Sequence, residues 1–425
     1  MSANADAASR PASVFRHPGF RWLWGAETIS QFGSQFSQLA IPVLAVLVLH
    51  AEAWQLGVLN AADTAAFLLV GLPAGAWVDR MLKRRVMIVA DLVRAVALAA
   101  IPLMWWLGVL QIWQLVIVGA VVGTATVFFD VSYQSYIPIL VESRQVADAN
   151  SKLEASFEVA RIGGPGLAGA LLTVISAPLL LLADAISFFI SAAALARIRD
   201  NEVRADPADR LGLGREIAEG VRFVAGQPLI RRIVGSTAAF NFFSALAFVL
   251  FPLLLLRTLG LGPGALGLIL SVGAVGGLLG ALATPHLARL VGEGTVIPLS
   301  AIASALLIGA LPLAAVVPSA ALPVLIVAQF LQSFLVLVYN ITQVTLRQRL
   351  CPPRLLGRMN ASIRCVVWGV MPIASLVGGA LGGWIGIVPT LWIAFAGSIA
   401  GTSFVVFSPL LGMRTLPTET EPASA

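Results

Sequence analysis

The chain has 425 residues, of which 58% are hydrophobic and only 11% are charged, whereas charged residues make up roughly a quarter of a soluble domain. This composition excludes a soluble globular protein and predicts an integral membrane protein whose apolar helices cross a hydrocarbon core of about 30 Å. The formal net charge of +6 describes one basic membrane face and no nucleic-acid site, because the sequence contains no soluble basic domain.

Twelve apolar segments follow one another when the chain is divided at prolines, glycines and charged clusters. We predict an all-α membrane protein with twelve transmembrane helices over roughly 20–49, 54–78, 86–108, 111–140, 150–176, 178–198, 228–256, 264–290, 294–316, 320–346, 355–385 and 389–411. Nearly all of the 27 basic residues fall in loops on one side of this arrangement. Cytosolic loops carry an excess of lysine and arginine, so that side and both termini are expected in the cytosol.

The two halves of the sequence match when one is shifted by 210 positions, so that Pro18 meets Pro228 and Phe32 meets Phe242. We interpret this as two six-helix halves related by a parallel pseudo-two-fold repeat, with a cavity between them; coincidence between apolar sequences is the alternative. The expected domains are a cytosolic tail (1–19), a first bundle (20–198), a cytosolic linker (199–227) with an amphipathic helix at 213–224, a second bundle (228–411) and a cytosolic tail (412–425).

Acidic residues inside the predicted spans all belong to the first half. Such residues are costly in a membrane and are functional candidates, because an unpaired carboxyl group in an apolar site can exchange a proton near neutral pH. Asp91 and Arg94, three positions apart, are expected to form a structural pair. The candidate proton carriers are Glu27, Asp63, Glu158 and Asp184. Glu158 can instead form a pair with Arg161, Asp184 can be structural, and a carboxylate can also set cavity polarity or bind a cationic substrate.

Charge is concentrated between the second and third spans, in the stretch 75–85, GAWVDRMLKRR. Gly75 permits close helix packing, and Asp79 can accept hydrogen bonds at the N-terminus of a neighbouring helix. The basic residues of this stretch include Arg80, Lys83 and Arg84. We expect them to pair with a carboxylate just inside the membrane, Asp130. A loop that only sets the orientation of the chain is the alternative.

A second stretch of small residues, 161–169 (RIGGPGLAG), lies on the fifth predicted span. The glycines Gly164 and Gly169 let helices approach closely, and Pro165 bends the helix and frees a backbone carbonyl. Ordinary helix packing alone can account for this stretch.

Aromatic residues and amides recur on three spans that could line the central cavity. The candidates are Gln31, Phe32, Gln35, Phe36, Asn241, Phe242, Tyr339, Asn340 and Gln343. This mixture suits a large, partly apolar solute. Packing against lipid is the other explanation for the phenylalanines.

These motifs resemble those of the major facilitator superfamily. The stretch GAWVDRMLKRR looks like its loop signature G-x-x-x-D-R/K-x-G-R-R/K, with Leu82 in place of the second glycine. The stretch RIGGPGLAG is similar to the G-P-x-x-G-G element of antiporter members, with Ala168 in place of one glycine. The strings FRWLWG at 20–25, DLVR at 91–94 and DAISF at 184–188 resemble the bacterial branch that contains macrolide efflux proteins and the enterobactin exporter.

The resemblance implies a proton-coupled antiporter of the bacterial inner membrane that exports a small amphipathic compound, such as an antibiotic or a siderophore, by alternating access. In the family the charged loop latches the outward-open state on the cytosolic side, so the resemblance implies that the stretch 75–85 and Asp130 form a cytosolic gate. A monomer in the lipid bilayer is expected, with protons and a small-molecule substrate as partners and without cofactor or metal. An importer, a lysophospholipid flippase or a dedicated natural-product exporter are the alternatives. An enzyme is not expected, because zinc-protease, hydrolase-elbow and Walker motifs are missing from the sequence.

Overall fold

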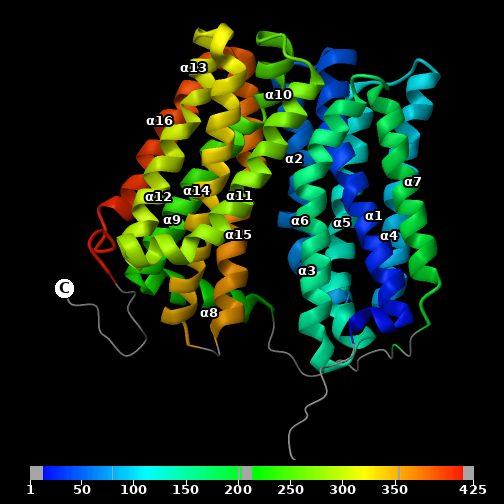
Figure 1. Ribbon diagram of the computed structural model, residues 1–425, viewed down its shortest axis with the longest axis horizontal. Coiled ribbons are helices and arrows are strands. Elements are labelled where there is room, and N and C mark those ends of the chain that lie inside the picture. The colour runs from blue at the N-terminus through cyan, green and yellow to red at the C-terminus, as the bar shows by residue number, and fades with distance from the viewer. Residues whose placement is uncertain (1–12, 79, 200–201, 203–212, 353–354, 415–425) are drawn as a thin grey trace, which may run out of the picture.

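The computed structural model describes residues 13–78, 80–199, 202, 213–352 and 355–414, and every regular element in these ranges is helical (Figure 1). Ten of the described helices have the length and the apolar composition needed to cross a membrane. The predicted spans 54–78 and 150–176 are not among these ten but are also helical. The all-helical prediction is therefore confirmed for the described residues.

The elements of the first half lie together on one side of the molecule (Figure 1). They are η1 (Val14–Arg16), α1 (Pro18–Val43), η2 (Leu44–Val48), α2 (Ala53–Leu69), α3 (Gly71–Val78), α4 (Lys83–Trp106), α5 (Ile112–Leu140), η3 (Ser143–Gln145), α6 (Val146–Leu171) and α7 (Ala177–Ala196). We call these helices the first group.

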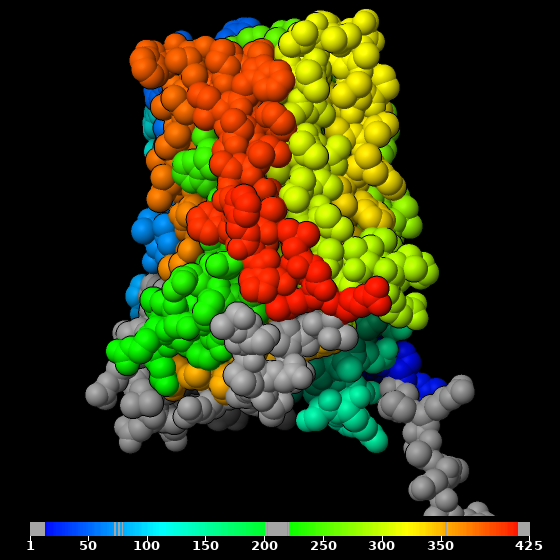
Figure 2. Space-filling model, turned by 90° about the vertical axis from the view of Figure 1, so that its left-hand side faces the viewer, coloured from blue at the N-terminus to red at the C-terminus, as the bar shows by residue number. Residues whose placement is uncertain are grey.

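The elements of the second half lie beside them and form the second group (Figure 1). They are α8 (Leu213–Gly226), α9 (Pro228–Phe248), α10 (Phe251–Leu253), η4 (Leu254–Thr258), α11 (Pro263–Val291), α12 (Glu293–Ile308), α13 (Ala310–Val316), η5 (Pro318–Ala320), α14 (Ala321–Leu350), α15 (Leu356–Trp384) and α16 (Ile387–Val406). The expected linker helix is present as α8, which packs against α15 and α9. Figure 2 shows the green segment that contains it at one end of the molecule, beside the red α16.

We call the end of the molecule that carries α8 and the α3–α4 turn the basic end, and the end with η2 and η4 the opposite end (Figure 1). Large apolar side chains are exposed along the helices between the two ends, among them Val96, Leu282 and Leu306. A soluble protein would bury most of this surface, whereas a lipid bilayer solvates it.

The two groups meet mainly along two helix pairs, α2 with α15 and α6 with α11. Glycine permits both contacts, because a Cβ atom on Gly57 would lie 2.6 Å from the carbonyl oxygen of Ser375, and one on Gly267 would lie 2.3 Å from that of Pro165. At the opposite end the π-helical turns η2 and η4 meet, and Arg257 Nη2 donates to the carbonyl oxygen of Val46 at 3.3 Å. The contacts between the two groups therefore include the opposite end and the helix pairs that begin there.

Candidate functional site

Asp91 and Arg94 of α4 are buried in the first group and form the expected ion pair. Ser191 Oγ of α7 donates to Asp91 Oδ2 at 2.6 Å. The guanidinium of Arg94 lies between two rings, with its Cζ 4.3 Å from the centroid of Phe129 and 4.2 Å from that of Phe188. Charge, hydrogen bonding and cation–π contact thus all stabilise this arginine inside the bundle.

Asp184 of α7 is also buried, at 1% exposure, and its carboxylate accepts hydrogen bonds from two serines. Ser37 Oγ of α1 donates to Oδ2, and Ser187 Oγ lies 3.0 Å from Oδ1. Gly33 makes this contact between α1 and α7 possible, because a Cβ atom there would lie 2.3 Å from Asp184 Oδ1. Both oxygens of Asp184 are satisfied, which is the arrangement expected of a structural carboxylate.

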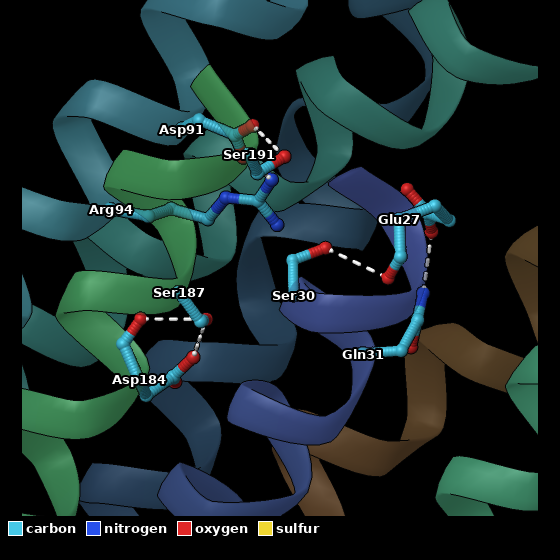
Figure 3. A network of polar contacts seen from close by, with 8 residues as sticks. All are labelled: Glu27, Ser30, Gln31, Asp91, Arg94, Asp184, Ser187 and Ser191. Atoms are coloured by element: carbon cyan, nitrogen blue, oxygen red, sulfur yellow. Dashed lines mark hydrogen bonds and ion pairs between the residues drawn. The ribbon is translucent and has the colours of Figure 1, made fainter. Parts of the chain in front are cut away.

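Glu27 of α1 lies beside this network and differs from Asp184 in having a free oxygen (Figure 3). Its side chain is 6% exposed, and Gln31 Nε2 donates to Oε1 at 2.7 Å. Oε2 is buried without a hydrogen-bond partner among the described residues. Figure 3 shows the side chain of Arg94 extending from α4 towards the helix that carries Glu27. A buried carboxyl oxygen without a partner can bind a proton without breaking an existing contact.

The remaining candidate carriers lie in different surroundings. Asp63 of α2 is exposed and makes no hydrogen bond or ion pair among the described residues. Glu158 of α6 pairs with Arg161, whose Nη2 lies 2.8 Å from Glu158 Oε2, and both side chains are about 30% exposed. The structure therefore does not bring the four candidates into one site.

The predicted gate stretch reaches the described residues only in part, because Asp79 lies outside them. Gly75 belongs to α3, and Arg80 is exposed in the turn before α4. Lys83 and Arg84 begin α4, and their backbone N–H groups donate to the carboxylate of Glu202 at 2.6 and 3.2 Å.

In the described conformation Glu202 is a carboxylate partner of Lys83 and Arg84, and the pairing of the basic cluster with Asp130 remains a prediction. Lys83 Nζ lies 3.9 Å from Glu202 Oε1, whereas Asp130 is half-buried on α5 without an ion pair or hydrogen bond in the described part of the chain. The first turn of α4 leaves free N–H groups at the positive end of the helix dipole, and these favour a carboxylate. Arg84 also donates to the carbonyl oxygen of Ile198, which fixes the chain after α7 to this turn.

The glycine and proline stretch of α6 packs against two helices. A Cβ atom on Gly164 would lie 2.5 Å from Cβ of Gln35 on α1, and one on Gly169 would lie 2.9 Å from the carbonyl oxygen of Pro263 on α11. Pro165 lies within α6 between these two contacts. The described geometry agrees with the packing interpretation of the stretch, and the antiporter interpretation remains a prediction.

The predicted cavity residues fall into several environments. On α1, Gln31 bonds to Glu27, Gln35 is buried against Gly164, and Phe32 and Phe36 are half-buried. On the second group, Phe242 stacks edge-on against Phe243, and Gln343 is buried with its Oε1 unpartnered among the described residues.

The three other candidates, Asn241, Tyr339 and Asn340, line a cavity within the second group. Its volume is about 40 Å³, and its lining comprises Ser236, Thr237, Phe240, Asn241, Ala301, Ser304, Val336, Tyr339, Asn340, Ser398 and Thr402. We call it the hydroxyl-lined cavity. Its serines and threonines were not predicted, because such residues are common at ordinary helix contacts in membranes. The shift of 210 positions could have found them, since it places Ser304 on Arg94.

Comparison with known proteins places this geometry in a family. The model of the transmembrane secretion effector family, a branch of the major facilitator superfamily, matches residues 9–421. The multidrug efflux pump Tap of Mycolicibacterium fortuitum is 28% identical over 265 residues, which cover 60% of this chain and 64% of Tap. The match thus spans somewhat less than two thirds of the length of that relative.

Solved transporters share the fold at low identity. A mutant of the nucleoside transporter NupG superposes with a TM-score of 0.77 at 12% identity, over 92% of this chain and 100% of that chain. A bacterial homologue of the iron transporter ferroportin, in its inward-facing state, gives a TM-score of 0.73 at 19% identity, over 93% and 99% of the two chains. The chain therefore belongs to the transmembrane secretion effector family of the major facilitator superfamily, and it is a multi-pass membrane transporter and not an enzyme.

Proposed function

We propose that this transporter is a proton-coupled exporter of a small amphipathic compound, such as an antibiotic or a siderophore. The observation that carries the proposal is Glu27, a buried carboxylate with one unpartnered oxygen beside the Asp91–Arg94 pair. The relative Tap is a multidrug efflux pump by its name, which supports export. Protons and the transported compound are the partners, and the unit works as a monomer without cofactor or metal.

The proposed architecture has twelve transmembrane helices, with α2–α3 and α6 as the two spans beyond the ten apolar helices. Its two halves are related by a pseudo-two-fold repeat. The contacts between the groups support this repeat. Gly57 of α2 packs against Gly379 of α15, and Gly267 of α11 packs against Gly169 of α6. A shift of 210 positions aligns Gly57 with Gly267 and Gly169 with Gly379, so it converts one contact into the other. Motion about such an axis would open the two ends alternately.

We place the basic end in the cytosol of a bacterial cell, with both termini on that side of the inner membrane, since cytosolic loops are rich in basic residues. The contacts of η2 with η4 then close the outer end, so the described conformation faces inward. In this conformation Glu27 would release its proton to the cytosol as the compound binds. The basic cluster at Lys83 and Arg84 acts as the cytosolic gate.

The direction of transport does not follow from the fold, since nucleoside and iron transporters share it. Import, lipid flipping and a dedicated natural-product exporter are therefore tested together with export. The purified protein is reconstituted into proteoliposomes that are loaded with ethidium or erythromycin. A pH gradient of either sign is then imposed across the vesicle membrane. The variants are Glu27→Gln and Asp63→Asn, with Glu52→Gln, an exposed carboxylate before α2, as the matched control.

We expect the parent and Glu52→Gln to move a probe against its gradient, and Glu27→Gln to bind the probe but lose all gradient-driven transport. If Glu27→Gln and Asp63→Asn both transport at the parent rate, the assignment of the proton carrier is wrong. If the parent moves neither probe under either gradient, the drug-export proposal fails and a dedicated natural product or a lipid becomes the substrate to test.

A further inference from the structure

The hydroxyl-lined cavity occupies the place in the second group that buried charges fill in the first. The shift of 210 positions that aligns the halves sets Ala301 on Asp91 and Ser304 on Arg94. In the first group these positions of α4 hold the ion pair; in the second group the same positions of α12 hold a methyl and a hydroxymethyl group. The loss of a carboxylate and a guanidinium leaves space, and that space is the cavity.

The two aromatic walls around the guanidinium have changed in the same way. Phe129, on one side of Arg94, corresponds to Tyr339, which remains aromatic and lines the cavity. Phe188, on the other side, corresponds to Ser398, whose small side chain also lines it. The cavity thus has one ring and one hydroxyl where the first group has a ring on each face of a cation.

The lining offers hydrogen bonds without charge. None of the eleven described lining residues is ionisable at neutral pH. Ser304 Oγ donates to the carbonyl oxygen of Ser300 at 2.7 Å, and Thr402 Oγ1 donates to that of Ile399 at 2.8 Å, so both hydroxyls keep lone pairs that can accept. Ser398 Oγ is buried and unpartnered among the described residues, and it can both donate and accept.

The burial of the lining residues shows that the cavity is more accessible on one side than on the other. The residues from α12 and α16, including Ser304 and Ser398, are fully buried, whereas Asn241 of α9 and Asn340 of α14 are half-buried. The closed bottom therefore lies against α12 and α16, and the more accessible side lies at α9 and α14. At about 40 Å³ the space admits a functional group or a few water molecules, and no whole drug-sized compound.

We propose that the hydroxyl-lined cavity binds a neutral hydrogen-bonding group, a hydroxyl or a carboxamide, of the compound that the protein transports. A charged group would be desolvated there without a counter-charge, which is unfavourable. A neutral donor and acceptor would instead satisfy Ser398. The identity of the ligand as transport substrate rests on the proposed function; the neutral character of the site rests on the cavity alone.

Cysteine labelling tests the site without any gradient or transport. Cys351 and Cys365, which are free, are first replaced by serine, and Ser398→Cys is introduced. The purified protein reacts with three methanethiosulfonates, which carry a hydroxyethyl, a trimethylammonium-ethyl or a sulfonatoethyl group. Each reagent forms a disulfide with the thiolate and releases methanesulfinate, and each rate is divided by the rate with free 2-mercaptoethanol. The matched control is Ser300→Cys, one helical turn from Ser304, because Ser300 is buried but lies outside the lining.

We expect the hydroxyethyl reagent to label Ser398→Cys at least tenfold faster than either charged reagent and at least tenfold faster than it labels Ser300→Cys. Equal rates for neutral and charged reagents, or no advantage over Ser300→Cys, would overturn the neutral site. Thr402→Cys gives the same test from the neighbouring turn of α16 and serves if Ser398→Cys does not fold.

A filling substitution tests the link to the substrate. Ser398→Phe introduces the residue of the equivalent position, Phe188, and should occupy the cavity. We expect it to slow proteoliposome transport of erythromycin, which carries several hydroxyls, at least tenfold, and to change transport of ethidium, which has none, less than twofold. Equal effects on both probes, or no effect on either, would refute a role for the cavity in binding the substrate. A parent that transports neither probe counts against the proposed function, while the labelling rates still decide the chemistry of the cavity.

Discussion

Replacing Arg94 by methionine keeps an unbranched side chain between Phe129 and Phe188 but removes the positive charge. Asp91, with 0% exposure, is then left with the hydroxyl of Ser191 as its remaining described partner. Removing one member of a buried ion pair costs about 3–5 kcal/mol, because the other charge stays buried and uncompensated. We expect Arg94→Met to lower the free energy of unfolding by this amount, which is more than about 100-fold in the equilibrium constant.

The double variant Asp91→Asn/Arg94→Met removes both charges and should lie within about 2 kcal/mol of the parent, since no buried charge remains. Unfolding by dodecyl sulfate in mixed micelles, followed by tryptophan fluorescence, measures the three free energies. Arg144→Met is the control, because its pair with Glu142 is more than 60% exposed on both sides and should contribute at most about 1 kcal/mol. The reasoning is refuted if Arg94→Met costs less than about 1 kcal/mol, or if the double variant is as unstable as Arg94→Met.

Two further substitutions test the packing of the groups and the role of Asp184. Gly267→Val should destabilise the protein by about 1–3 kcal/mol, because its side chain meets the carbonyl of Pro165, whereas Gly383→Val, with open space around it, should have little effect in the same unfolding assay. Ser37→Ala removes a donor from the buried carboxylate of Asp184 and should cost about 1–3 kcal/mol; a loss below about 0.5 kcal/mol would show that this hydrogen bond does not matter for stability.

The helices were largely predictable from the sequence, because a backbone in lipid must satisfy its own hydrogen bonds and apolar length then marks each span. Local departures from regular geometry were not. The helix that begins at Ala53 breaks after Leu69, and the ends of α1 and α10 widen into the π-helical turns η2 and η4. Pro42 and Pro252, two positions before each turn, are visible in the sequence, but a proline can equally bend a helix or end it.

The candidate site was predictable where it depends on helix geometry alone. Asp91 with Arg94, and Glu158 with Arg161, are three positions apart, so one helix face brings each pair together. Contacts between distant segments could not be derived in this way. Glu202 reaches the start of α4 because the chain turns back after α7, and nothing in the composition of the linker indicates that path.

The exchange of an ion pair for small polar residues in the second group has a consequence for how this protein can change over generations. The candidate proton carriers lie on helices of the first group, with Glu27 on α1 and Asp63 on α2, whereas the hydroxyl-lined cavity is built from α9, α12, α14 and α16. Under the proposed function, proton coupling and substrate recognition are encoded in separate stretches of the gene. Selection by a new toxic compound can then favour substitutions in the second stretch, while the residues that couple transport to the proton gradient stay unchanged.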